Sequence, residues 1–206
     1  MTFQRTVNRN FTTGFPGEIV RDGPTRAKVV RLVASSQATS PRYQGNLVGR
    51  VYGYTGEVPA TGTTLAALVQ TVEIGGAAYA GVLIHPKHYV LQGTVQGGTL
   101  APSIALNDGT EAEVADMAIL IAEVFNPTEA AAQFNSGDLL AYVTTATTNV
   151  QDPIGLPLGA IVSFPAGTAI PAGFAALPGT IQNPVGLAAS APSAPVSTLT
   201  IIQLTH

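Results

Sequence analysis

The sequence predicts an all-β protein, an antiparallel β-sandwich or jelly-roll, and three observations carry this prediction. Turn signals made of Gly, Pro, Asn and Asp recur along most of the chain at about every 10 residues, which is the spacing of a sandwich or barrel. Between them lie short runs rich in Val, Ile, Leu and Tyr, in which β-branched and aromatic residues favour strands. Between residues 153 and 184 prolines recur every four to eight residues, so no long helix can form there.

Composition divides the chain into three parts. Residues 1–17 are predicted to form an extended N-terminal arm, because loop-forming Asn, Thr, Gly and Pro alternate there with three Phe side chains. Residues 18–152 hold most strand patterns and are predicted to form the sandwich or jelly-roll core. Residues 153–206 contain 8 prolines and no Asp, Glu, Lys or Arg. Because disordered segments are normally charged, we expect here an ordered, Pro/Gly-rich extended segment that ends in a closing strand packed on the core or on a neighbouring subunit.

Alternation and flanking turns predict the individual strands. They are expected at residues 28–34, 47–54, 65–74, 78–84, 89–95, 139–144 and 198–204. Residues 81–97, two apolar runs divided at Pro86, are predicted to form the centre of the sheet. Gly49 and Gly53 fall on one face of their strand, which indicates a bend or the close approach of another backbone. Residues 107–109, Asn-Asp-Gly, predict a hairpin turn.

Two segments bear on whether the chain contains helix. Glu111–Phe125 (EAEVADMAILIAEVF) places Val114, Met117 and Ile121 at helical spacing, but its β-branched residues and the preceding turn favour a strand. We predict a strand, because every neighbouring element is a strand. Residues 128–133 (TEAAAQ) are the best helix candidate and would make barely two turns.

Charge is scarce and unevenly distributed. Charged residues make up 10% of the chain, against about 25% in a typical soluble domain. This favours an oligomer or a subunit of a larger assembly, in which apolar surface is buried against a partner. Up to Arg50 there are eight bases and two acids, a net charge of +6, whereas the rest of the chain has one base and ten acids, a net charge of −9. Such an asymmetry indicates a partner.

Several classes of protein are disfavoured by what the sequence lacks. There is no Cys, so no disulfide framework, thiol nucleophile or Cys-based zinc site can form. Arg5 and Arg9 interrupt the N-terminal segment, and we expect no secretory signal peptide. The longest apolar run, residues 117–122, is far shorter than the roughly 20 residues that span a bilayer. Phosphate-binding, nucleophile-elbow and zinc-protease motifs do not occur. We therefore expect no membrane insertion, no catalytic residues and no cofactor.

Two groups of residues could be read as binding sites. His85 and His88 could ligate a metal, but they flank Pro86 with no nearby carboxylate, so we expect turn residues and no metal site. The basic segment 26–31 could contact phosphates, but it lies in a strand pattern with few aromatics, and nucleic-acid binding is a minor alternative.

An acidic cluster follows the predicted hairpin turn. Asp108, Glu111, Glu113 and Asp116 could supply a catalytic carboxylate pair or a calcium site, but the spacing of a calcium loop is absent. We expect a solvated edge strand whose charges prevent wrong strand pairing. Some of these acids could instead meet the basic first quarter of an adjacent copy.

Five segments carry a resemblance to a known family. They are residues 17–27 (GEIVRDGPTRA), 80–94 (AGVLIHPKHYVLQGT), 106–120 (LNDGTEAEVADMAIL), 135–142 (NSGDLLAY) and 198–205 (TLTIIQLT). Together and in this order they resemble the structural cement, or decoration, proteins of tailed bacteriophage capsids. The resemblance implies a non-enzymatic virion protein on the capsid exterior that bridges major capsid protein subunits as a homodimer or homotrimer. Such a protein is made in the host bacterial cytoplasm, and the family has no catalytic residues to transfer.

The N-terminal region is the expected contact surface. Its aromatic side chains would act as anchors and its arginines as ion-pair donors to an acidic shell surface or to a sister subunit. A frayed chain end is the alternative interpretation. The residues expected at this interface are Phe3, Arg5, Arg9, Phe11, Arg21 and Arg26. The alternative function is a β-sandwich receptor- or carbohydrate-binding module of a phage virion, although Trp is absent and most of the six Tyr lie within strand patterns.

Overall fold

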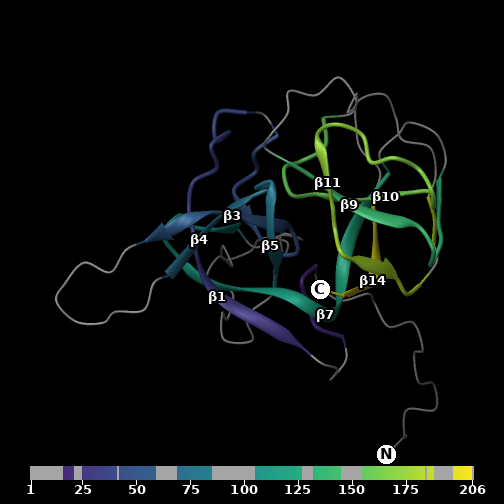
Figure 1. Cartoon of the computed structure of the whole chain (residues 1–206), viewed down its shortest axis with the longest axis horizontal. Coiled ribbons are helices and arrows are strands. Elements are labelled where there is room, and N and C mark those ends of the chain that lie inside the picture. The colour runs from purple at the N-terminus through teal and green to yellow at the C-terminus, as the bar shows by residue number, and fades with distance from the viewer. Residues whose placement is uncertain are drawn as a thin grey trace, which may run out of the picture.

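The chain, as a computed structural model, is all-β and is arranged around one 15-residue strand, β7 (Glu111–Phe125) (Figure 1). The structure describes residues 16–20, 25–40, 42–58, 69–84, 105–126, 132–144, 155–183, 185–187 and 197–205. No helix occurs within these ranges. The all-β prediction is therefore confirmed, and so is the strand predicted for Glu111–Phe125.

Thirteen shorter strands accompany β7 in the described part of the chain. They are β1 (Arg26–Leu32), β2 (Asn46–Leu47), β3 (Val51–Val58), β4 (Val69–Ile74), β5 (Ala78–Leu83), β6 (Ala105–Leu106), β8 (Ala132–Phe134), β9 (Leu139–Val143), β10 (Ile161–Phe164), β11 (Phe174–Ala176), β12 (Gly179–Ile181), β13 (Val185–Leu187) and β14 (Ser197–Leu204).

The N-terminal half of β7 closes a first ring of five strands. The strand order is β1–β4–β3–β5–β7, and β7 pairs back with β1. The β1–β4 pair is parallel, whereas the other four pairs are antiparallel. The finer prediction, an antiparallel sandwich or jelly-roll, is not confirmed, because here the sheet closes on itself as it does in a barrel.

The C-terminal half of β7 belongs to a second group of strands, which we call the second ring; its circuit is completed by the chain that leads from β11 to β12 and not by a pairing of these two strands. β10 pairs with β7 in parallel at Val124 and Phe125, and β9 and β11 follow. β11 pairs with β9. The chain then continues through Leu177 and Pro178 into β12, which pairs with β14. β14 returns to β7 through eight residue pairs. In Figure 1, β7 accordingly extends from the group of β1, β3, β4 and β5 on the left to the group of β9, β10, β11 and β14 on the right.

Two clusters of buried apolar side chains lie along β7. Each cluster contains residues of both rings: one includes Leu32 of the first ring and Val162 of the second, and the other includes Val82 of the first ring and Leu120 of the second. All four side chains are fully buried. Burying one such side chain contributes about 1.5–3 kcal/mol relative to leaving it exposed. Because β7 contributes to both clusters, it is the structural link between the two rings.

Glycines allow backbone segments to approach each other closely, both within the first ring and between the two rings. At Gly53 a Cβ atom would overlap the carbonyl of Gly76, so the predicted close approach of another backbone is confirmed there. Gly159 has a φ of +69°, and a Cβ there would lie 2.6 Å from the Val51 oxygen. Its backbone accepts a hydrogen bond from Val51 N at 3.0 Å and donates one to Val143 O at 2.9 Å. This glycine therefore joins β3 in the first ring to β9 in the second.

Some local predictions were wrong. Residues 47–54 do not form one strand, because the chain turns at Gly49, where φ is +79° and the amide donates to Leu83 O. The turn at 107–109 exists, but it does not make a hairpin: β6 pairs with β2, and Leu32 bonds the turn through Gly109 N and Thr110 O. Ala132 and Gln133, expected in a helix, belong to β8, which pairs with β13.

The predicted centre of the sheet, residues 81–97, is displaced by β7. β5 ends at Leu83 and pairs with β3 and β7, whereas residues 85–104 lie outside the described residues. β7 pairs with β1, β5, β10 and β14 and therefore holds the central position. The uncharged segment after residue 152 contributes β10, β11, β12 and β14 to the second ring.

Candidate functional site

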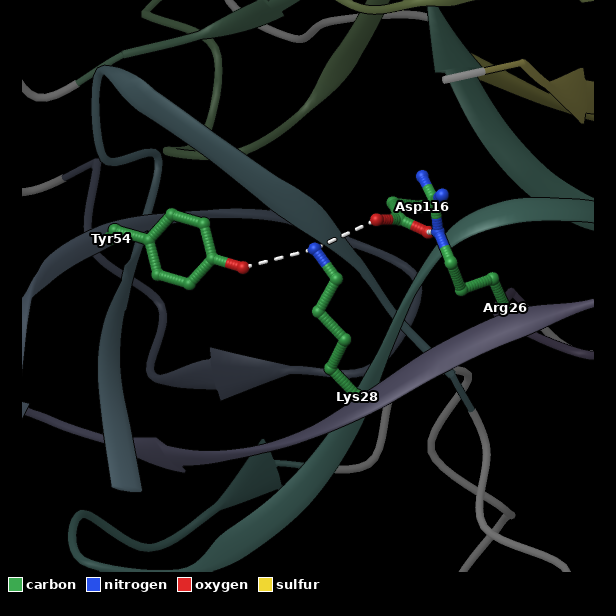
Figure 2. A network of polar contacts seen from close by, with 4 residues as sticks. All are labelled: Arg26, Lys28, Tyr54 and Asp116. Carbon is green, nitrogen blue, oxygen red and sulfur yellow. Dashed lines mark hydrogen bonds and ion pairs between the residues drawn. The ribbon is translucent and has the colours of Figure 1, made fainter. Parts of the chain in front are cut away.

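The most deeply buried carboxylate among the described residues is that of Asp116, at an irregularity in the pairing of β1 with β7. Arg26 lies opposite Met117 and Ala27 lies opposite Ala115, so Asp116 is the extra residue of a β-bulge. Asp116 is 2% exposed. A bulge redirects a side chain, and here the carboxylate lies beside side chains from β1, while β3 contributes Tyr54 to the same cluster (Figure 2).

Both oxygens of this carboxylate are bound by cations. Arg26 Nε donates to Asp116 Oδ1 at 2.7 Å, and Lys28 Nζ lies 2.7 Å from Asp116 Oδ2. Lys28 Nζ also donates to Tyr54 Oη at 3.1 Å, and it lies 5.6 Å from the centre of the Tyr54 ring. Figure 2 shows the Lys28 ammonium between Tyr54 and Asp116, so that Lys28 joins β1 to both β3 and β7. We call these four residues the Asp116 network.

The ionisation of the Asp116 network is set by its own contacts. Burial alone would raise the pKa of Asp116, but hydrogen bonds from Arg26 and Lys28 outweigh it and hold that pKa below its usual value. The hydrogen bond to Asp116 raises the pKa of Lys28 and that of Arg26 in turn. The network is therefore charged at neutral pH. A carboxylate fixed in this state is poorly suited to move a proton, and its role is to fasten β1 to β7.

A second ion pair with one buried partner lies where the two rings meet. Arg50, which immediately precedes β3, is 6% exposed, and its Nη2 donates to Glu123 Oε2 of β7 at 2.9 Å. Its guanidinium lies 4.8 Å from the centre of the Phe125 ring. Ser197 Oγ of β14 donates to the other Glu123 oxygen at 2.6 Å. Glu123 thus connects the entry to β3 with the first residue of β14.

Burial dominates the electrostatics of Arg50. It lowers the pKa of the guanidinium, and the attraction of Glu123 offsets this only in part. Arg50 Nη1 is buried and has no hydrogen-bond partner among the described residues. A guanidinium that is stacked on an aromatic ring and paired on one edge is a packing element of the ring junction.

The prediction of an acidic edge strand was wrong, although Glu111 and Glu113 are exposed as predicted. β7 is not an edge, because β1 lies along one side of it and β5 and β14 lie along the other. Asp116 is buried, Glu111 lies opposite Arg31 of β1, and Asp108 accepts a hydrogen bond from Asn46 Nδ2 at 2.7 Å. The acids meet the basic strand of their own chain, since β1 and the first half of β7 are antiparallel neighbours.

The basic residues between positions 25 and 50 are engaged within the chain. Arg26 and Lys28 bind Asp116, Arg50 binds Glu123, and Arg31 lies opposite Glu111. Arg42 donates through Nε to Leu156 O at 2.9 Å. The positive charge that the sequence places before residue 51 is therefore compensated in part inside the molecule.

Of the expected interface residues, the structure places only Arg26, which it brings to Asp116. Phe3, Arg5, Arg9, Phe11 and Arg21 lie outside the described residues, as do His85 and His88. In the described part of the chain no group of three or more His, Cys, Asp or Glu residues could hold a metal ion. The same part has no helix long and apolar enough to span a membrane.

Neither ion pair with a buried partner was predicted from the sequence. Asp116 and its partner Arg26 are 90 positions apart, and Arg50 and Glu123 are 73 apart. One signal was available: Arg50 shares an alternation with Val48 and Tyr52, a pattern that would place it on a buried face and would require a partner for it.

Comparison with known proteins adds no relatives. No protein-family model matches the chain, and no curated protein sequence matches it. The resemblance to decoration proteins therefore stays a prediction.

Proposed function

We propose that this chain is a virion structural protein that binds the outer surface of the icosahedral phage capsid and stabilises it by bridging major capsid protein subunits. The observation that carries the proposal is the use of the ionisable groups. The buried carboxylate of Asp116 and the buried guanidinium of Arg50 both hold strands together. Ion pairs used in this way stabilise the fold, which supports a structural role for the protein.

A cement protein can act without an active site. It stabilises a shell by burying surface area across subunit boundaries. This requires an interface of at least about 1,000 Å² and no pocket. Many copies act at once on one shell, so weak contacts by each copy suffice. A chain with only 10% charged residues has little desolvation to overcome at such a contact. The proposal includes a homodimer or homotrimer, and it does not require a jelly-roll.

The test is co-sedimentation of the purified protein with undecorated, expanded phage shells, with the bound copies counted per shell. We expect saturable binding at a fixed ratio to the major capsid protein, together with shells that melt at a higher temperature. The ratio also distinguishes dimers from trimers. A well-folded protein that binds no shell would contradict the proposal.

Charge variants separate the proposed docking contact from the fold. The variant Arg5→Ala, Arg9→Ala, Arg21→Ala should bind shells more weakly, and its loss of binding should diminish as salt rises, because salt screens the contact that was removed. Arg26→Ala also breaks the Asp116 network, so it should lower the stability of the free protein as well as the binding. Equal shell binding by the triple variant and the unaltered protein at low salt would exclude the basic N-terminal contact.

The alternative, a receptor- or carbohydrate-binding module, is tested by a glycan array with the same protein. Sugar binding normally uses exposed aromatic rings, whereas Tyr52 and Tyr142 are fully buried and Tyr54 is bound to Lys28. Specific glycan binding without shell binding would favour the alternative.

A further inference from the structure

Both ends of the described chain pair with the same stretch of β7. On one edge, Gly17 N donates to Ile121 O at 2.8 Å, and Val20 N donates to Ile119 O at 2.9 Å. On the other edge, β14 pairs with residues 118–125. Leu120 lies opposite both Ile19 and Ile202, so the two terminal segments hold this residue between them.

The directions of the two segments decide how they respond to force. Both run antiparallel to β7. The first enters beside Ile121 and continues through β1 towards Glu111, whereas β14 ends with Leu204 beside Ala118. A pull that separates the two ends draws each segment along its own axis, away from its own paired residues. The pulls on the two edges of β7 are opposite in direction.

Strand pairs resist such a pull better than a sideways one. Hydrogen bonds of an antiparallel ladder are perpendicular to the strands, so a force along the strand loads them together. A force that lifts one strand end loads them one after another. Here the axial pull meets eight residue pairs between β14 and β7 and six between β1 and β7.

The two ion-pair clusters lie on these same seams. Ser197, the first residue of β14, is bonded to Glu123 at 2.6 Å, and the Asp116 network joins β1 to β7. Each terminal segment is thus fastened to β7 by a polar contact in addition to its ladder.

We infer that β7 and its two terminal neighbours form a mechanical clamp, which keeps the body folded when the two ends of the described chain are pulled apart. The inference concerns the chain itself and does not depend on the proposed function. For a protein that bridges subunits, a clamp of this kind would allow tension to cross the body without unfolding it.

Single-molecule pulling with two pairs of attachment points tests the clamp. The chain has no Cys, so introduced cysteines give unique handles. Glu18→Cys with Thr205→Cys pulls along both ladders. With Glu111→Cys and Thr205→Cys, the force on Thr205 points back along β14, because Glu111 lies ahead of the end of β14 along β7. This force opens the ladder one pair at a time, from Leu204 towards Ser197. Forced unfolding reports the unfolding rate under load, so the two geometries are compared at one pulling speed.

We expect the first rupture of the axial pair at a force at least twofold higher than that of the peeling pair, and in a single step. Equal forces, or a lower force for the axial pair, would overturn the inference. Both variants must unfold at the same denaturant concentration as the unaltered chain. If either exposed Glu substitution shifts that midpoint, Asn107→Cys in the turn before β7 replaces Glu111→Cys, and Val20→Cys replaces Glu18→Cys. The same twofold criterion then applies.

Discussion

The two rings hold the same strand by different means. The first ring fixes β1 to β7 with the Asp116 network, in which one buried carboxylate binds two cations. In the second ring β9, β10, β11, β12 and β14 contain no charged residue, and β14 is held by eight uninterrupted residue pairs and apolar packing. Two cations thus support the ladder where a bulge interrupts it, whereas the regular β14 ladder relies on its residue pairs, on apolar packing and on one hydrogen bond from Ser197 to Glu123.

The largest expected effect tests whether the rings are separable at all. Leu120 is fully buried on the shared strand in the core of the second ring, and Leu120→Ala should lower the free energy of unfolding by about 3 kcal/mol, because a cavity remains. Denaturant unfolding should be followed by NMR signals of Tyr52 in the first ring and of Tyr142 in the second. The unfolding midpoints reported by the two signals should fall by the same amount. A first ring whose transition is unchanged in this variant would show that the rings unfold independently.

The next effect isolates the charged seam. Asp116→Asn keeps the shape of the side chain but replaces two charge-assisted bonds, so it should cost about 2 kcal/mol of stability. Glu113→Gln, on the same strand and exposed, is the matched control and should change stability by less than about 0.5 kcal/mol. Equal effects of the two variants in denaturant titrations would remove the distinction between the rings.

Acid should weaken the first ring through the same carboxylate. The folded-state pKa of Asp116 lies below its ordinary value of 3.8, so its contribution is intact at higher pH and is lost as the pH falls through the folded-state value. Thermal melts between pH 7 and pH 2 should show a steeper loss for the unaltered chain than for Asp116→Asn. Parallel curves for the two proteins would contradict this account.

Alkali should produce the smallest effect, in the second ring. Burial raises the pKa of Tyr142 to about 12, from an ordinary value of 10.0. Its contribution is therefore intact below pH 10 and is lost as the pH rises towards 12. Tyr142 Oη lies 3.0 Å from Gly76 O, so Tyr142→Phe should cost about 1 kcal/mol at neutral pH and should reduce the alkaline loss. If the stability of Tyr142→Phe falls with rising pH as steeply as that of the unaltered chain, this role is excluded.

Local pattern was sufficient to predict the all-β class and most of the longer strands, but not short strands such as β8, whose first residues were expected in a helix. β-branched residues and the preceding turn identified Glu111–Phe125 as a strand despite its helical spacing, and paired glycines indicated the close approach at Gly53. Alternation reports which side chains share a face, but it does not report which strand lies alongside. The parallel β1–β4 pair, the closure of the first ring and the shared role of β7 therefore could not be derived from it.

The charged clusters failed to emerge from the sequence for a related reason. In the sequence, Asp116 resembles one member of an exposed acidic run. In the fold, the bulge redirects its side chain towards cations of β1, of which Arg26 is 90 positions away in the chain. Arg50 sits in an apolar alternation, which indicated burial but not its partner. Ion pairs over such separations depend on the completed fold.

Native-state hydrogen exchange along β7 measures directly whether this strand unites both rings in one cooperative unit. Amides from Ala112 to Phe125 should exchange only through global unfolding, with one common free energy, because the strand is paired along both edges. A markedly lower free energy for residues 118–125 than for 112–117, or the reverse, would show that one ring opens without the other and would contradict the account.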